Sequence, residues 1–73
     1  MPAEIHELDV VALTIDLPDH KLVRGQVGTV VMDYGVDAAE VEFSDNNGHT
    51  YALLAVPKDK LMLLHFEPAQ TAA

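Results

Sequence analysis

Apolar and polar residues alternate along this chain in short segments, a spacing typical of β-strands rather than of helices. The clearest case is residues 39–43, where Ala39, Val41 and Phe43 are separated by Glu40 and Glu42. Because successive side chains of a strand point to opposite faces, the apolar three should face a core and the two glutamates water. Four further apolar segments cover residues 8–15, 26–34, 50–56 and 61–66. The pattern therefore predicts five strands.

Turn-forming residues separate these segments. Pro18 cannot donate to a strand ladder, so residues 16–21 form a loop, and Leu17 and Leu22 should fold back over one end of the core. Gly35 opens the next break. Asn47-Gly48 joins two strand-like segments, which predicts a type I′ hairpin turn with both residues at positive φ. Residues 57–60 are the right length for one short helical turn before the fifth strand.

Two glycines three residues apart, Gly25 and Gly28, lead directly into a β-branched segment. Glycine tolerates positive φ and a close approach of neighbouring backbone, so this spacing suits a tight bend that opens a strand. A side chain at Gly28 should collide with a neighbouring strand. Such entries are typical of small, strongly curved antiparallel barrels.

Five short strands in a chain of 73 residues avoid long exposed edges most simply when the sheet bends over its own apolar face. We expect an all-β fold, a small five-stranded antiparallel SH3-like barrel over residues 7–66, with a flexible lead-in at 1–6 and a disordered tail at 67–73. The competing oligonucleotide-binding barrel usually has a helix between its third and fourth strands. Residues 45–48 leave no room for one.

Charge narrows the range of partners. Twelve acidic residues face four basic ones, Lys21, Arg24, Lys58 and Lys60, giving a net charge of −8. This balance opposes binding to nucleic acid and to anionic membranes, and it would attract a basic protein partner. The chain starts without a secretory signal and has no apolar segment long enough to span a membrane, so a cytoplasmic location is expected.

The sequence gives little support to catalysis or metal binding. No cysteine is present, and the four histidines, His6, His20, His49 and His65, form no closely spaced ligand pair. Glu40 and Glu42 lie on one strand face, but a barrel this small fills its interior with its own side chains. We therefore expect no enzymatic activity, no cofactor and no metal.

Two continuous apolar segments predict a contact surface. Residues 53–56 and 61–64 do not alternate, so each must place apolar side chains outside the barrel as well as inside it. Either the connector and the tails cover them, or a protein partner or a second copy does. The candidate interaction residues are Glu40, Glu42, Leu61, Met62, Leu63 and Leu64, and the last strand should be an open edge.

The order and spacing of four segments resemble the small bacterial domain-of-unknown-function family 4926. These segments are residues 8–13, 22–31, 41–43 and 48–53. The resemblance implies an SH3-like barrel in a stand-alone bacterial protein and supplies no catalytic residue. It also implies a role as an antitoxin-like or accessory partner of a neighbouring gene product. The alternative hypothesis is a nucleic-acid-associated barrel that uses the loop from Arg24 to Gly28.

Overall fold

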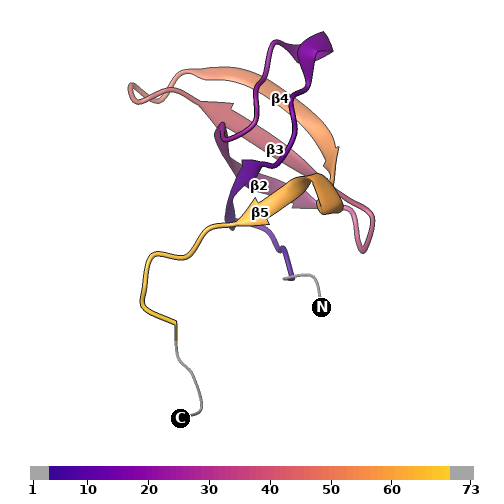
Figure 1. Cartoon of the computed structure of the whole chain (residues 1–73), viewed down its shortest axis with the longest axis vertical. Helices are drawn as coiled ribbons and strands as arrows, with labels where there is room; N and C mark the ends of the chain where they lie inside the picture. The colour runs from indigo at the N-terminus through magenta and orange to yellow at the C-terminus, as the bar shows by residue number, and fades with distance from the viewer. Residues whose placement is uncertain (1–3, 70–73) are drawn as a thin grey trace.

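The computed structural model describes residues 4–69 and contains one five-stranded antiparallel sheet with the strand order β4-β3-β2-β1-β5 (Figure 1). Two single-turn 3-10 helices lie between strands, and no α-helix occurs in this described range. The all-β prediction is confirmed. In chain order the elements are β1 (Val10–Leu13), η1 (Pro18–His20), β2 (Val27–Asp33), β3 (Ala38–Ser44), β4 (Thr50–Pro57), η2 (Lys58–Lys60) and β5 (Leu61–Leu63).

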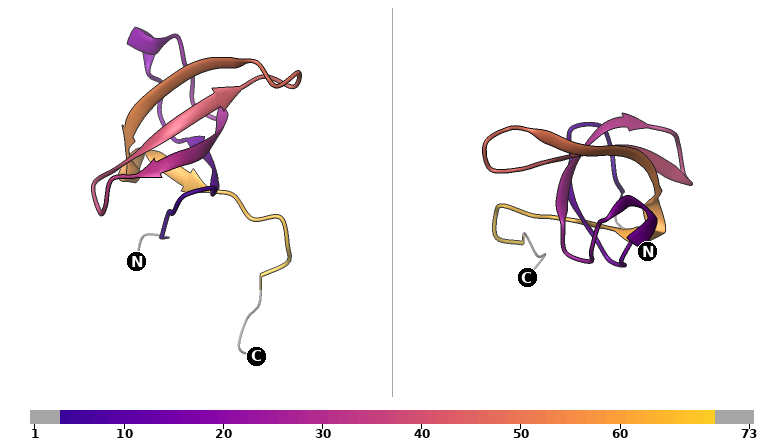
Figure 2. Two further views of the ribbon diagram at one scale, coloured as in Figure 1. Left: turned by 180° about the vertical axis from the view of Figure 1, so that it is seen from behind. Right: turned by 90° about the horizontal axis from the view of Figure 1, so that it is seen from above.

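The sheet bends round its own inner face, as the two views in Figure 2 show. A register shift between Val30 and Met32 marks a β-bulge in β2, and such bulges increase local twist and bending. The strand order and the 3-10 turn between the last two strands are those of an SH3-like barrel. The barrel is open, because within residues 4–69 no ladder joins β4 to β5.

The core lies inside this bend. Ala39, Val41 and Phe43 of β3 are fully buried, whereas Glu40 and Glu42 are only partly covered, so the predicted alternation is confirmed. Leu17 and Leu22 form an isolated bridge, and both contribute to the core as expected. The other fully buried large side chains are Leu13, Val11, Val30 and Val56.

The packed part of the chain begins earlier than expected. Ile5, placed in a loose lead-in by sequence, is only 4% exposed and belongs to the core. Leu8, expected to begin the first strand, instead has a φ of 72° and is 79% exposed. The fifth strand ends at Leu63 rather than at residue 66. Residues 67–69 are exposed without regular structure, and the rest of the predicted tail lies outside the described residues.

The β3–β4 hairpin has a different turn from the one predicted. Gly48 has a φ of +83°, but Asn47 is not at positive φ, so the type I′ prediction is wrong. The Asp45 N–H donates to His49 O at 2.9 Å, which leaves a three-residue loop closed by a left-handed glycine. The Asp45 carboxylate accepts the backbone N–H of both Asn47 and His49, and this side-chain capping favours the longer loop.

Candidate protein-interaction surface

Glu40 and Glu42 lie on the outer face of the sheet, where each is held by a neighbouring hydroxyl. The Tyr34 hydroxyl donates to Glu40 Oε1 at 2.9 Å, and the Thr50 hydroxyl donates to Glu42 Oε2 at 2.8 Å. The hydrogen bond to Glu40 raises the pKa of Tyr34, because the neutral phenol is the form that donates it. Each carboxylate keeps further acceptor capacity toward solvent. The two glutamates therefore form an ordered acidic pair.

The four candidate residues of the last strand divide between the two faces. Leu61 is buried opposite Leu13, and Leu63 is partly buried against the core. Met62 lies opposite Ala12 and is 53% exposed. Leu64 follows the strand, is half-buried, and donates its N–H to Val10 O at 3.0 Å.

One row of directly opposed residues extends from Glu42 to β1 on one side and to β4 on the other. Val10 of β1 lies opposite Thr29 of β2, and Thr29 lies opposite Glu42 of β3. Glu42 in turn lies opposite Leu53 of β4. Since directly opposed residues share a face, this row crosses four strands on the outside of the barrel.

Several apolar side chains on the outer face are about half exposed. Leu53 is 57% exposed and Met62 is 53% exposed, and both belong to strands at the ends of the sheet. Val27 of β2 lies opposite Ala12 of β1 and is 46% exposed. The connector and the described part of the tail therefore leave these positions uncovered, and the outer face combines exposed apolar groups with carboxylates.

The β4 strand is a long open edge. It runs for eight residues and pairs only with β3 in the described part of the chain. In an antiparallel ladder alternate residues direct their N–H and C=O groups to opposite sides, so half of these groups point away from the sheet. Sequence reasoning expected an edge only at the last strand. Lysine and proline usually protect edge strands, and the fourth segment is long and has neither in its interior. These two features could have indicated that β4 is a second open edge.

All four basic residues lie between strands rather than in them. The strands β2, β3 and β4 contain no lysine or arginine, whereas Lys58 and Lys60 lie in η2 and Lys21 and Arg24 in the β1–β2 loop. In that loop the Asp16 carboxylate accepts the Arg24 backbone N–H at 2.8 Å. The loop that would contact nucleic acid therefore contains a carboxylate beside Arg24, and this negative charge weakens the attraction of the loop for phosphate.

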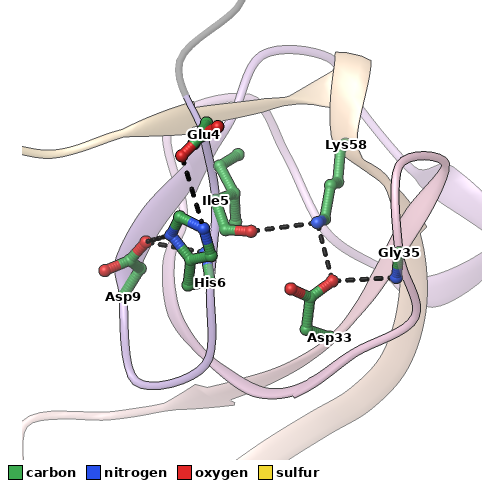
Figure 3. Close-up of polar contacts among 7 residues, drawn as sticks. All are labelled: Glu4, Ile5, His6, Asp9, Asp33, Gly35 and Lys58. Carbon is green, nitrogen blue, oxygen red and sulfur yellow. Dashed lines mark hydrogen bonds and ion pairs between the residues drawn. The ribbon is translucent and has the colours of Figure 1, made fainter.

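A second feature is an open hollow of about 420 Å³ beside the C-terminal end of β2. The residues that line it include Ile5, His6, Val36 and Lys58. Figure 3 shows how its polar groups pair. Lys58 Nζ donates to Ile5 O at 2.9 Å and lies 2.7 Å from Asp33 Oδ1. The hydrogen bond from Lys58 lowers the pKa of Asp33, and the Gly35 N–H lowers it further. These contacts hold the N-terminal segment against the barrel.

The predicted turn glycines have two different structural roles. Gly25, Gly35 and Gly48 have φ values of +93°, +100° and +83°, and a Cβ there would meet nothing within 4 Å. Gly28 has an ordinary φ but no space, because a Cβ would lie 2.6 Å from Val41 Cγ1 and 2.9 Å from Glu42 O. Gly28 thus allows β2 to bend closely over β3.

Two further observations concern residues 4–69. No group of three or more histidine, cysteine, aspartate or glutamate side chains is arranged to hold a metal ion there. In the same range no helix is both long and apolar enough to cross a membrane.

The fold and this surface define a small open SH3-like barrel with an acidic, partly apolar outer face. The chain belongs to the family described as a domain of unknown function (DUF4926), whose profile matches residues 7–63. No curated protein and no solved structure matches the chain.

Proposed function

We propose that this chain is a bacterial protein-interaction module that binds its partner in the cytoplasm through the outer face of the sheet. The observation that carries the proposal is the row linking Glu42 with Leu53, flanked by exposed apolar side chains on both end strands. Exposed apolar groups bordered by polar ones are typical of protein-binding surfaces.

The partner is a neighbouring gene product, toward which this chain acts as an antitoxin-like or accessory subunit. The charge of −8 supports a basic partner, because opposite charge accelerates encounter and disfavours unrelated acidic proteins. A second copy of the chain would carry the same charge, and this repulsion opposes a homodimer.

Co-expression with each neighbouring gene product tests the proposal. A partner that co-purifies is then purified alone, and its affinity is measured for wild type, Leu53→Lys, Met62→Lys and Val36→Lys. Val36 is 90% exposed in the β2–β3 turn and is not part of the proposed binding surface, so its variant is the matched control. We expect the control to bind like wild type and the two surface variants to lose at least about tenfold in affinity, the cost of one buried anchor.

Equal affinity for all four proteins, or the absence of any partner among the neighbours, would contradict this proposal. A steeply salt-dependent affinity for generic RNA that disappears in Arg24→Ala would favour the nucleic-acid alternative instead.

A further inference from the structure

The open edge of β4 differs from the rest of the outer face, because it exposes backbone groups as well as side chains. We propose that β4 accepts an extended, basic segment of a protein partner as an added sixth strand. This inference rests on the proposed function and specifies the partner's chemistry.

The backbone groups that remain free on β4 can be assigned from the register. Val30 of β2 donates its N–H to Asp9 O and accepts the Leu8 N–H, so its backbone groups point toward β1. Val41, opposite Val30, must therefore direct its groups to the other side, toward Leu54 of β4. It follows that Leu54 is bonded into the sheet.

Residues 53 and 55 flank Leu54, so their N–H and C=O groups point away from the sheet. Both residues are exposed. An added strand would satisfy these groups and cover Leu53, which is 57% exposed. This is the way in which sheet edges bind peptides: main-chain hydrogen bonds supply affinity and side-chain contacts supply specificity.

The charges near the edge select a basic strand. Glu40 lies opposite Ala55, and Glu42 lies opposite Leu53, so both carboxylates border the edge strand on its outer face. No lysine or arginine occurs in β3 or β4. Lysine or arginine side chains on the outer face of an added strand would extend over the edge residues toward these carboxylates. A second copy of β4 brings no such cation, which disfavours edge pairing between copies of this chain.

The test uses the full chain labelled with ¹⁵N and a synthetic peptide of alternating lysine and valine, measured at 150 mM salt to limit non-specific attraction. The reversed-charge control peptide alternates glutamate and valine. We expect the lysine peptide to shift the amide resonances of residues 50–57 and to slow hydrogen exchange at Leu53 and Ala55 at least tenfold. The glutamate peptide should leave the spectrum unchanged.

Two variants separate edge pairing from simple charge attraction. Ala55→Pro removes one outward N–H but no bond to β3, whereas Ala55→Val keeps that N–H. We expect Ala55→Pro to weaken peptide binding at least tenfold and Ala55→Val to bind like wild type. Should Ala55→Pro fail to fold, hydrogen exchange in the wild-type complex decides, because charge attraction alone would leave the Leu53 and Ala55 amides exchanging as fast as in the free protein, a result that would overturn the inference.

In the peptide experiments, three results would overturn the inference: no shift in β4, equal shifts with both peptides, or undiminished binding by a folded Ala55→Pro. If concentration alone shifts the same resonances and sedimentation detects a dimer, the occupant is a second copy and the basic-strand assignment is wrong. If a natural partner binds the surface and has the same affinity for Ala55→Pro as for wild type, only this inference is overturned. The absence of any partner would overturn the proposed function itself.

Discussion

Lys58 Nζ lies 2.7 Å from Asp33 Oδ1 and 2.9 Å from Ile5 O, so one ammonium group joins η2, the end of β2 and the N-terminal segment. The Lys58 and Asp33 side chains are 17% and 28% exposed, which reduces the solvent screening that weakens most surface ion pairs. Ile5, whose carbonyl is held in this way, belongs to the core. Lys58 therefore holds the Ile5 backbone beside Asp33 and supports the burial of the Ile5 side chain in the core.

Replacing Lys58 should destabilise the protein. Lys58→Met keeps most of the apolar stem but removes the ammonium that donates to Asp33 and Ile5, so the carboxylate keeps only the Gly35 N–H and the Ile5 carbonyl loses its side-chain donor. We expect the melting temperature to fall by roughly 5 °C or more, since a small domain loses about 4–8 °C per kcal/mol. Lys60→Met is the control, because the Lys60 side chain makes no hydrogen bond or ion pair within residues 4–69. Equal melting temperatures for the two variants would show that the Lys58 contacts are not stabilising.

Acid should remove part of the stability. The pKa of Asp33 is lowered in the folded protein by the hydrogen bonds from Lys58 and Gly35, so the folded state favours its ionised form. This contribution is complete above the ordinary value of 3.8 and is lost as the pH falls below it. Chemical denaturation between pH 6 and pH 2.5 should show a steeper decline for wild type than for Asp33→Asn. Parallel declines would contradict this assignment.

Gly28 should tolerate no side chain. A Cβ there would lie 2.6 Å from Val41 Cγ1 and 2.9 Å from the Glu42 carbonyl oxygen, and the backbone atom cannot move aside cheaply. We expect Gly28→Ala to cost about 1–3 kcal/mol in the free energy of unfolding, the usual range for overpacking. Thr29→Ala, one residue along the same strand, should change stability by less than about 1 kcal/mol. Urea denaturation of both variants measures the difference, and a Gly28→Ala protein as stable as wild type would show that β2 and β3 are further apart.

The hairpin turn should distinguish between two substitutions at Gly48. Its φ of +83° lies in the left-handed region, where a β-branched residue is strained and asparagine is tolerated. Gly48→Val should therefore be less stable than Gly48→Asn by about 1 kcal/mol or more. Thermal denaturation by circular dichroism would detect this as several degrees, and identical curves would argue against a left-handed residue at this position.

Local patterns were sufficient to predict the fold. The alternation around Val41 places one face of β3 in the core, and the glycine at position 48 marks a hairpin whatever the turn type. The turn type itself depended on the Asp45 carboxylate, which caps two backbone N–H groups and favours a longer loop. This competition between a side chain and the ideal turn could not be decided from the Asn-Gly pair alone.

The parts that could not be predicted depend on distant contacts. Ile5 is buried because the bent sheet brings η2 next to the N-terminal segment, 53 residues away along the chain. The candidate surface was predicted only in pieces: Glu42 and Met62 were chosen for separate reasons, and only the strand order shows that both lie on one outer face. The open edge of β4 depends on which strands remain unpaired, and no local pattern determines that.

The central claim is that partners bind the outer face of the sheet. Its most direct test is an amide chemical-shift map of the ¹⁵N-labelled full chain, titrated with the purified partner identified by co-expression. The account predicts the largest perturbations at Glu40, Glu42, Leu53 and Met62, with small ones at Gly25 and Val36. Perturbations concentrated in the loop from Arg24 to Gly28, or around the hollow beside Lys58, would contradict it.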